Sequence, residues 1–249
     1  MIKLKDISTL PPNEITEELA EKKTLELAKK IGQLQRIIYA EEKHAVLVII
    51  QGMDASGKDG ATRNVFGECG ISGTDSYAFK KPTEEEFAHD FLWRIHKIAP
   101  RKGYFMIFNR SHYEDVLIQR VHRWIDEDRV NSRIDAINAF ETLLEKDNST
   151  TILKFYLHIS HEVQQKKLQE RIDDPEKNWK HNATDWEESK HWDSYMEAYE
   201  DAINRSVIPW HVIPVDKKWY RDYLIAEITH KALLELEPKL PFLDNVVKP

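Results

Sequence analysis

A glycine-rich loop that ends in lysine carries the strongest chemical signal in this sequence. It follows the apolar run 45–50 and reads, in order, Gly52, Met53, Asp54, Ala55, Ser56, Gly57, Lys58, Asp59 and Gly60. Backbone N–H groups in such a turn face inward, and the following helix adds its positive N-terminal end, so the loop can hold phosphate groups. The spacing fits the phosphate-binding pattern G-x-x-x-x-G-K, although Asp59 stands where Ser or Thr usually helps to bind magnesium.

A phosphate loop of this kind predicts a metal ion nearby. Phosphoryl transfer depends on positioning and on neutralising the phosphate oxygens, which is the work of magnesium and cationic side chains. Asp54 lies in the loop, and Asp115 follows a second apolar run, so in a parallel sheet we expect both to reach one Mg²⁺, with Mn²⁺ as the alternative. Asp59 is a weaker candidate, because a carboxylate in the first turn of a helix also serves the helix dipole.

Several basic residues could bind the remaining phosphate charge. Arg110 is the best candidate, since a guanidinium binds phosphate through two parallel hydrogen bonds, and its alternative is a surface ion pair. A second group could extend a phosphate track, although exposed basic residues are common: Arg63, Lys80 and Lys81. A third group lies on an apparent insertion and fits a lid that excludes water: Arg171, Lys177 and Lys180.

The histidines match no zinc-binding spacing. His112 is the exception in position, because it lies in the polar segment 109–115 after the second apolar run, where it can orient its neighbours by hydrogen bonding. Trp179 is expected in the core or stacked on a base. The lone Cys69 cannot form an internal disulfide and is interpreted as a packing residue.

These residues are predicted to be positioned by a parallel sheet with helices on both sides. Apolar runs alternate with helical patterns, which indicates an α/β fold. The expected strands are 45–50, 76–80, 103–108, 151–159 and 211–215, and the expected helices include 14–43, 59–68 and 84–97. The segment 169–186 breaks the alternation. We therefore expect an N-terminal helical arm at 1–44, a catalytic domain at 45–237 with a lid at about 169–186, and a C-terminal tail at 238–249.

Composition narrows the classes of function. The chain has 249 residues and a formal net charge of −7, and neither a bilayer-spanning apolar run nor the features of a secretory signal is present. We expect a cytoplasmic protein with no membrane partner, and the acidic balance argues against a nucleic-acid partner. Between positions 80 and 123, however, nine basic residues stand against six acidic ones, so a polyanion could bind locally.

Three segments of the chain resemble the polyphosphate kinase 2 family, whose members move phosphoryl groups between inorganic polyphosphate and nucleotides. These segments are 52–60, 108–116 and 170–180. The resemblance implies a three-layer P-loop kinase-like fold with a helical lid insertion. It also implies Asp54 and Asp115 as magnesium ligands, Lys58 and Arg110 on the transferring phosphates, and a lid at 171–180.

The same resemblance bears on the nucleotide. The sequence of 111–115, Ser-His-Tyr-Glu-Asp, is similar to the branch called class III, which accepts AMP and ADP. Glu114 would then face the nucleotide, with His112 beside it. Adenine nucleotides are the expected acceptors, and guanine nucleotides are the alternative.

Two other functions remain open at this point. An ATP-dependent nucleoside or nucleotide kinase would share the loop, the sheet and a basic lid. A nucleotide-binding switch would bind phosphates without turnover. The expected assembly is a homo-oligomer, a dimer or tetramer. Leu27, Ile31, Leu34 and Ile38 form an apolar stripe that could seal a dimer or merely cover the sheet.

Overall fold

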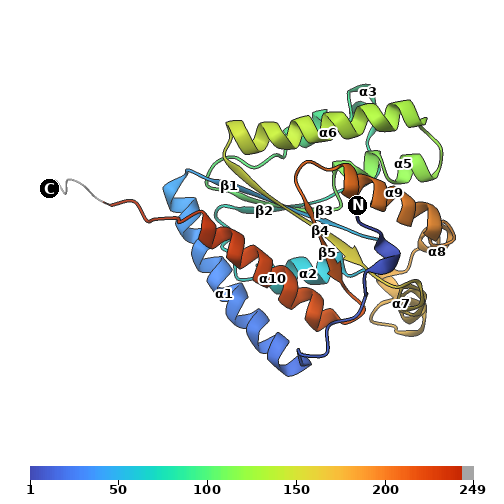
Figure 1. Cartoon of the computed structure of the whole chain (residues 1–249), viewed down its shortest axis with the longest axis horizontal. Helices are drawn as coiled ribbons and strands as arrows, with labels where there is room; N and C mark the ends of the chain where they lie inside the picture. The colour runs from blue at the N-terminus through green and yellow to red at the C-terminus, as the bar shows by residue number, and fades with distance from the viewer. Residues whose placement is uncertain (243–249) are drawn as a thin grey trace.

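A computed structural model describes residues 1–242 of the chain as a five-stranded sheet between two layers of helices (Figure 1). Every strand pair is parallel, and the spatial order is β2-β3-β1-β4-β5. The strands are β1 (Ala45–Gln51), β2 (Thr74–Ala78), β3 (Phe105–Asn109), β4 (Thr150–His158) and β5 (Trp210–Pro214). This confirms the expected α/β fold with a mainly parallel sheet.

The helices fall into a long framework and a set of short elements near the carboxyl ends of the strands. The longer ones are α1 (Glu17–Glu41), α2 (Lys58–Phe66), α6 (Glu127–Asp147), α7 (His161–Asp173), α9 (Trp192–Arg205) and α10 (Lys218–Glu235). The shorter ones are η1 (Leu4–Asp6), α3 (Glu84–Ala88), α4 (Trp93–His96), η2 (His112–Asp115), α5 (Ile118–Val121), η3 (Asn178–Lys180) and α8 (Ala183–Ser189).

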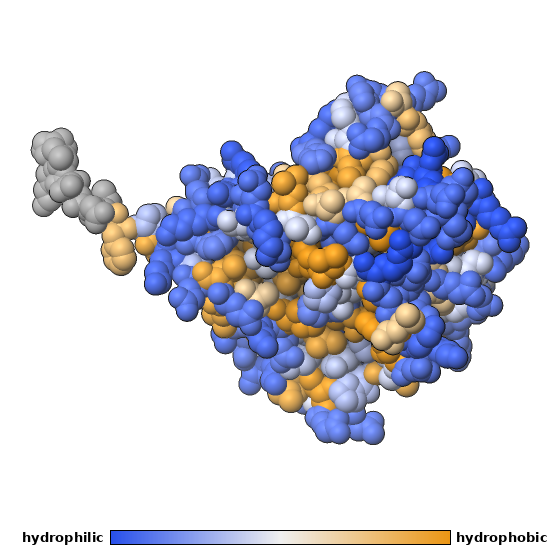
Figure 2. Space-filling model, turned by 45° about the horizontal axis from the view of Figure 1, so that its top comes forward, coloured by the Kyte–Doolittle hydropathy of each residue, from blue (hydrophilic) through white to orange (hydrophobic). Residues whose placement is uncertain are grey.

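The central strands are buried on both faces because helices cover both sides. All seven residues of β1 are buried, as expected for a continuous apolar run in a parallel sheet. Figure 1 shows α1, α2 and α10 on one side of the sheet and α6 on the other, with α7 and α8 near one end. On the face seen in Figure 2, hydrophilic residues cover most of the surface and hydrophobic ones gather towards its middle.

The N-terminal residues pack onto the domain and do not project from it as an arm. Ile31 and Ile38 are fully buried, and α1 lies along α10. Leu4 is buried as well, and the backbone N–H groups of Ile2 and Leu4 donate to Asn204 and Glu200 of α9. The apolar stripe of α1 therefore packs within the domain against α10 and α2, on one side of the sheet.

Two expected elements differ in detail. The helix predicted over 84–97 is divided into α3 and α4. The backbone becomes extended at His89, and a turn follows in which Leu92 N donates to the carboxylate of Asp90 and Trp93 N donates to its carbonyl. In the lid segment, α7 ends at Asp173 and η3 and α8 follow. The expected tail at 238–249 lies largely outside the described residues.

Candidate active site

The phosphate loop spans the turn between β1 and α2, and its backbone requires glycine at two places. Gly52 has φ 151° and Gly57 has φ 95°, a region that L side chains rarely adopt. A Cβ atom on Gly57 would also lie 2.1 Å from Nη1 of Arg221, a buried residue of α10. Gln164 of α7 holds the loop from another side, because its side-chain amide donates to the carbonyl of Asp54 at 3.2 Å.

Lys58 lies at the first position of α2 with its ammonium group turned into the loop. Its Nζ donates to the carbonyl oxygens of Gly52 at 2.8 Å and Met53 at 3.1 Å. Burial, assisted by the positive charge of Arg110, lowers the pKa of Lys58 to about 8, although three carboxylates oppose the shift: Asp54, Glu114 and Asp59. A bound phosphate would replace the two carbonyls as a stronger partner for the ammonium group.

Arg110 connects the loop to the end of the neighbouring strand. It follows β3 with a left-handed φ of 64°, and its backbone N–H donates to the carbonyl of Ile50. Its guanidinium binds Asp54 at 2.5 Å and Glu114 at 3.2 Å. The negative charge of Glu114, together with that of Asp54, outweighs burial and raises the pKa of Arg110. The guanidinium is therefore a permanent cation in front of the loop.

Glu114 and Asn109 complete the polar group around this arginine. Gln51, the last residue of β1, donates from its side chain to Glu114 at 3.0 Å. Asn109, the last residue of β3, donates to the carboxylate of Asp59. Neither Gln51 nor Asn109 was predicted from the sequence as a site residue, although each ends a strand beside one that delivers site residues. Asp59, in the first turn of α2, thus binds the end of β3.

Asp115 occupies a different environment from Asp54. It is 4% exposed, and its two carboxylate oxygens bind Arg94 at 3.1 Å and Gln119 at 2.6 Å. Burial raises the pKa of Asp115 against the opposing charge of Arg94. Each aspartate is thus paired with its own arginine, and sharing of one metal ion by Asp54 and Asp115 stays a prediction.

His112 is fully buried, and this corrects the expectation that it touches a nucleotide. Its Nε2 lies 3.2 Å from a carboxylate oxygen of Glu141, a buried residue of α6. A side chain without exposed surface can act on a ligand only by positioning its neighbours. That second role agrees with the orienting function expected from its place in the segment.

Three basic residues predicted to extend a phosphate track lie on the surface. Arg63, Lys80 and Lys81 are exposed, and the carbonyl of Lys80 accepts from Arg94, the partner of Asp115. They show no contact with the loop among the described residues. The structure therefore leaves a phosphate track through them as a prediction.

In the lid segment, Arg171 differs from the two lysines. Its guanidinium binds Asp185 of α8, and both side chains are largely buried. Burial raises the pKa of Asp185, and the negative charge of Asp54 adds to this, so α8 lies within electrostatic reach of the loop. Lys177 instead pairs with exposed Asp174, and Lys180 lies over the exposed ring of Trp179. Trp179 is therefore outside the core.

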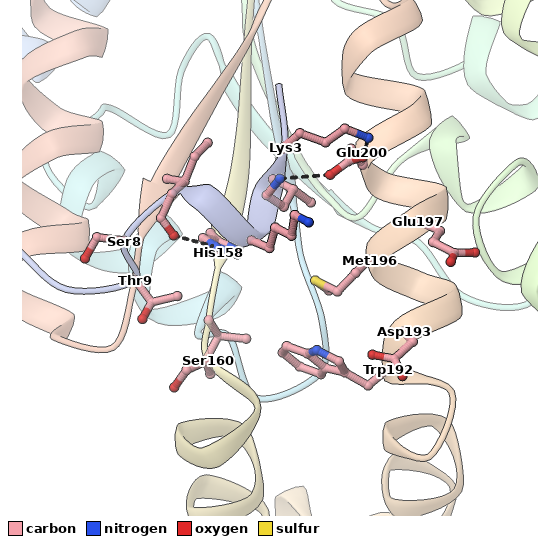
Figure 3. A pocket seen from close by; sticks show the side chains of 14 residues that line it. Lys3, Ser8, Thr9, His158, Ser160, Trp192, Asp193, Met196, Glu197 and Glu200 are labelled. Carbon is pink, nitrogen blue, oxygen red and sulfur yellow. Dashed lines mark hydrogen bonds and ion pairs between the residues drawn. The ribbon is translucent and has the colours of Figure 1, made fainter. Parts of the chain in front are cut away.

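A cavity of about 870 Å³ lies between the N-terminal segment, the end of β4 and α9 (Figure 3). Its wall includes Lys3, which pairs with Glu200, and His158, whose Nε2 lies 3.2 Å from the carbonyl of Ile7. None of the predicted site residues lines it.

Within residues 1–242, every helix is too short or too polar to cross a lipid bilayer.

Comparison with known proteins identifies the family. The model of the polyphosphate kinase 2 (PPK2) family matches residues 14–240. An AMP/ADP-polyphosphate phosphotransferase of Meiothermus ruber is 47% identical over 218 residues, which cover 86% of this chain and 81% of the relative. An ADP-polyphosphate phosphotransferase of Rhodopseudomonas palustris is 38% identical over 228 residues, with 86% and 78% covered.

A solved structure agrees with this result. The crystal structure of polyphosphate kinase 2 from Arthrobacter aurescens TC1 superposes with a TM-score of 0.95 at 38% identity, covering 99% of this chain and 90% of that one. The match extends over both helical layers and the lid segment. This chain therefore belongs to the polyphosphate kinase 2 family.

Proposed function

We propose that this protein transfers phosphoryl groups between inorganic polyphosphate and AMP or ADP, forming ADP and ATP, and that it requires Mg²⁺, with Mn²⁺ as a substitute. Family membership and the names of the relatives from Meiothermus ruber and Rhodopseudomonas palustris support the choice of substrates. Adenine nucleotides are the proposed acceptors, and guanine nucleotides are to be tested beside them.

One arrangement carries the proposal: Lys58, at the start of α2, and Arg110, just after β3, bring two cations to the phosphate loop. Lys58 binds the loop's own carbonyls, and Arg110 binds Asp54, so both cations hold exchangeable partners where phosphate groups would enter. Phosphoryl transfer is catalysed mainly by positioning and by charge neutralisation, and this pair provides both.

The reaction can be written from these residues. An oxygen of the nucleotide's terminal phosphate attacks the terminal phosphorus of polyphosphate. A new P–O bond forms while the bond to the bridging oxygen breaks, and that oxygen leaves on a chain one unit shorter. Lys58 and the loop N–H groups hold the donor phosphates, Arg110 moves from Asp54 onto the transferring group, and Glu114 holds the nucleotide end.

The donor set near the loop fits a magnesium ion. Among the described residues no group of three or more His, Cys, Asp or Glu forms a metal cage. Magnesium, however, is usually bound by one or two carboxylates together with phosphate oxygens and water. Asp54 is suited to this, and Asp115 would have to release Arg94 or Gln119 to join it. When bound, the ion neutralises charge on the phosphate oxygens.

A phosphorus NMR screen of donors and acceptors tests the proposal. Purified protein with Mg²⁺, polyphosphate and AMP should give the signals of ADP and then ATP. Formation of product from ATP and a nucleoside, but not from polyphosphate, would favour the nucleoside or nucleotide kinase. Tight nucleotide binding with no product from any donor would favour the non-catalytic switch. A strong loss of donor affinity with rising salt is expected for a long polyanion.

We also propose a cytoplasmic location and a dimeric or tetrameric assembly. The free Cys69 is compatible with a reducing compartment. Light scattering coupled to size-exclusion chromatography of the full chain measures the assembly directly, and a monomeric mass would contradict that part of the proposal.

A further inference from the structure

A buried ion pair lies beneath the segment that carries Glu114 and Asp115. Lys154, in the middle of β4, and Glu141, in α6, have side chains that are 0% and 1% exposed, and the ammonium and carboxylate groups are 2.5 Å apart. Neither residue belongs to the phosphate loop or the lid. Charged side chains are almost never buried this fully without a partner.

Each member of the pair favours the charged form of the other across this contact. Burial acts to raise the pKa of Glu141, but the hydrogen bond from His112 and the charge of Lys154 outweigh it and hold that pKa below its usual value. Burial lowers the pKa of Lys154, and Glu141 opposes the shift. As an ion pair, the Glu141 carboxylate accepts hydrogen bonds and the Lys154 ammonium donates them.

Both members of the pair bind the segment above them. The second carboxylate oxygen of Glu141 faces Nε2 of His112 at 3.2 Å, so the histidine ring must donate from that nitrogen. Nζ of Lys154 donates to the hydroxyl of Tyr113 at 2.8 Å and also to Ser206. His112 and Tyr113 directly precede Glu114 in the same 3₁₀ helix, η2.

Stability alone is a poor reason for this arrangement. Replacing a buried ion pair by apolar side chains of similar volume is often neutral or stabilising, whereas removal of one partner is costly. What an apolar pair could not supply is directional hydrogen bonding to two successive residues. The pair fixes His112 through an acceptor and Tyr113 through a donor, and so fixes the rotation of η2.

We propose that Lys154 and Glu141 are positioning residues that fix the orientation of η2. In this orientation Glu114 faces the nucleotide and accepts hydrogen bonds from Gln51 and Arg110. This inference rests on the proposed function. The pair acts on the nucleotide end of the site. The phosphate loop has other supports, because Gln164 binds it and Arg221 lies against Gly57. Loss of the pair should therefore affect the nucleotide more than polyphosphate.

Three variants separate positioning from stability. Lys154→Met and Glu141→Leu each leave one buried charge unpaired and should lower the melting temperature, while the double variant should recover it. In the double variant the KM for AMP should stay raised by about tenfold or more, since small displacements of a binding group are costly. The KM for polyphosphate should rise much less, because the phosphate loop is held by Gln164 and does not depend on the pair.

A matched control removes buried hydrogen bonds elsewhere. Gln35 of α1 is 1% exposed and binds Ser72 and Gly70, so Gln35→Leu should lower the melting temperature without changing the KM for AMP. Recovery of the KM together with the melting temperature in the double variant would overturn the proposal. An equal rise of both KM values would also overturn it.

A binding measurement distinguishes failure of this inference from failure of the proposed function. Calorimetric titration of wild type and double variant with AMP needs no turnover. If wild type binds AMP but transfers nothing from polyphosphate, the proposed function fails, and the positioning role still predicts weaker AMP binding by the double variant. If transfer is found and both proteins bind AMP equally, only the positioning role fails.

Discussion

Arg110 and Asp54 form an ion pair of 2.5 Å in front of the phosphate loop, although they stand at the ends of two different strands. The pairing depends on the parallel contact of β1 with β3, which aligns Ile50 with Asn109 and so places Arg110 beside the loop. Arg110 is a candidate for the reacting phosphates, and Asp54 is a candidate for the metal ion. The contact is therefore interpreted as the resting partnership of groups that separate when substrate and metal enter.

Asp54→Asn should reduce catalysis far more than stability. The side chains of Arg110 and Asp54 are 32% and 21% exposed, so loss of their ion pair should lower the free energy of unfolding by about 1 kcal/mol or less. The catalytic efficiency should fall by about 10²–10³-fold, as for other losses of transition-state charge stabilisation. Steady-state rates and thermal unfolding measure the two effects. Asp75→Asn, at an exposed acid of β2, is the control, and activity within threefold of wild type in Asp54→Asn would contradict the assigned role.

Anion binding should depend on the charge of Lys58 above neutral pH. Its pKa of about 8 in the folded protein lies below the ordinary value of 10.5, so between these pH values the unfolded chain holds a proton that the folded chain has released. This group's contribution to stability therefore rises with pH across that window. A bound anion favours the ammonium form, so binding takes up a proton and weakens as pH rises above 8.

Calorimetric titration with inorganic tripolyphosphate at pH 7 and pH 9 tests this expectation. The ligand itself titrates, so Lys58→Arg provides the reference, because an arginine remains charged at both pH values. The wild-type affinity should fall more between the two pH values than that of the variant. Equal losses in the two proteins would show that Lys58 does not titrate in this range.

The sequence predicted the sheet well because its strands are apolar runs bounded by polar turns. Each predicted strand lies within two residues of its observed ends, and α2 begins at Lys58 as the loop pattern requires. The division between α3 and α4 was missed, since it lies at a turn in which the side chain of Asp90 accepts from Leu92. Local hydrogen bonding of this kind competes with the helix and leaves no periodic signal.

The sequence pattern located the strand ends that come together at the loop, and it did not indicate the pairings between their side chains. Arg110 and Glu114 do lie at the phosphate loop, because strand order brings the ends of β1 and β3 together. Asp115 pairs with Arg94, which is 21 residues away in the sequence, and such a contact follows from the path of the loop after β2. Nothing in the sequence pattern distinguishes that arginine from the exposed ones around it.

Gly57→Ala should disable the phosphate loop for two separable reasons. A non-glycine residue in a left-handed conformation costs about 1–2 kcal/mol, and the new Cβ atom would also displace Arg221. Gly70→Ala is a matched control, because a Cβ atom there meets only ordinary contacts, the nearest at 3.6 Å. We expect weaker tripolyphosphate binding and a lower melting temperature only in the first variant. Unchanged binding by Gly57→Ala would contradict the assignment of the loop.

Arg171 and Lys177 should differ sharply although both are cations of the lid. Arg171 is largely buried against Asp185, which lies within electrostatic reach of Asp54, whereas Lys177 makes only exposed pairs with Asp174 and Glu170. An arginine that closes onto the transferring phosphates should contribute about 10²-fold to turnover, so Arg171→Ala should lower kcat by that factor. Lys177→Ala should change it little, because exposed ion pairs contribute about 0–1 kcal/mol. Stopped-flow and steady-state rates with polyphosphate and AMP decide the point, and equal losses in the two variants would mean that the whole lid acts through its net charge.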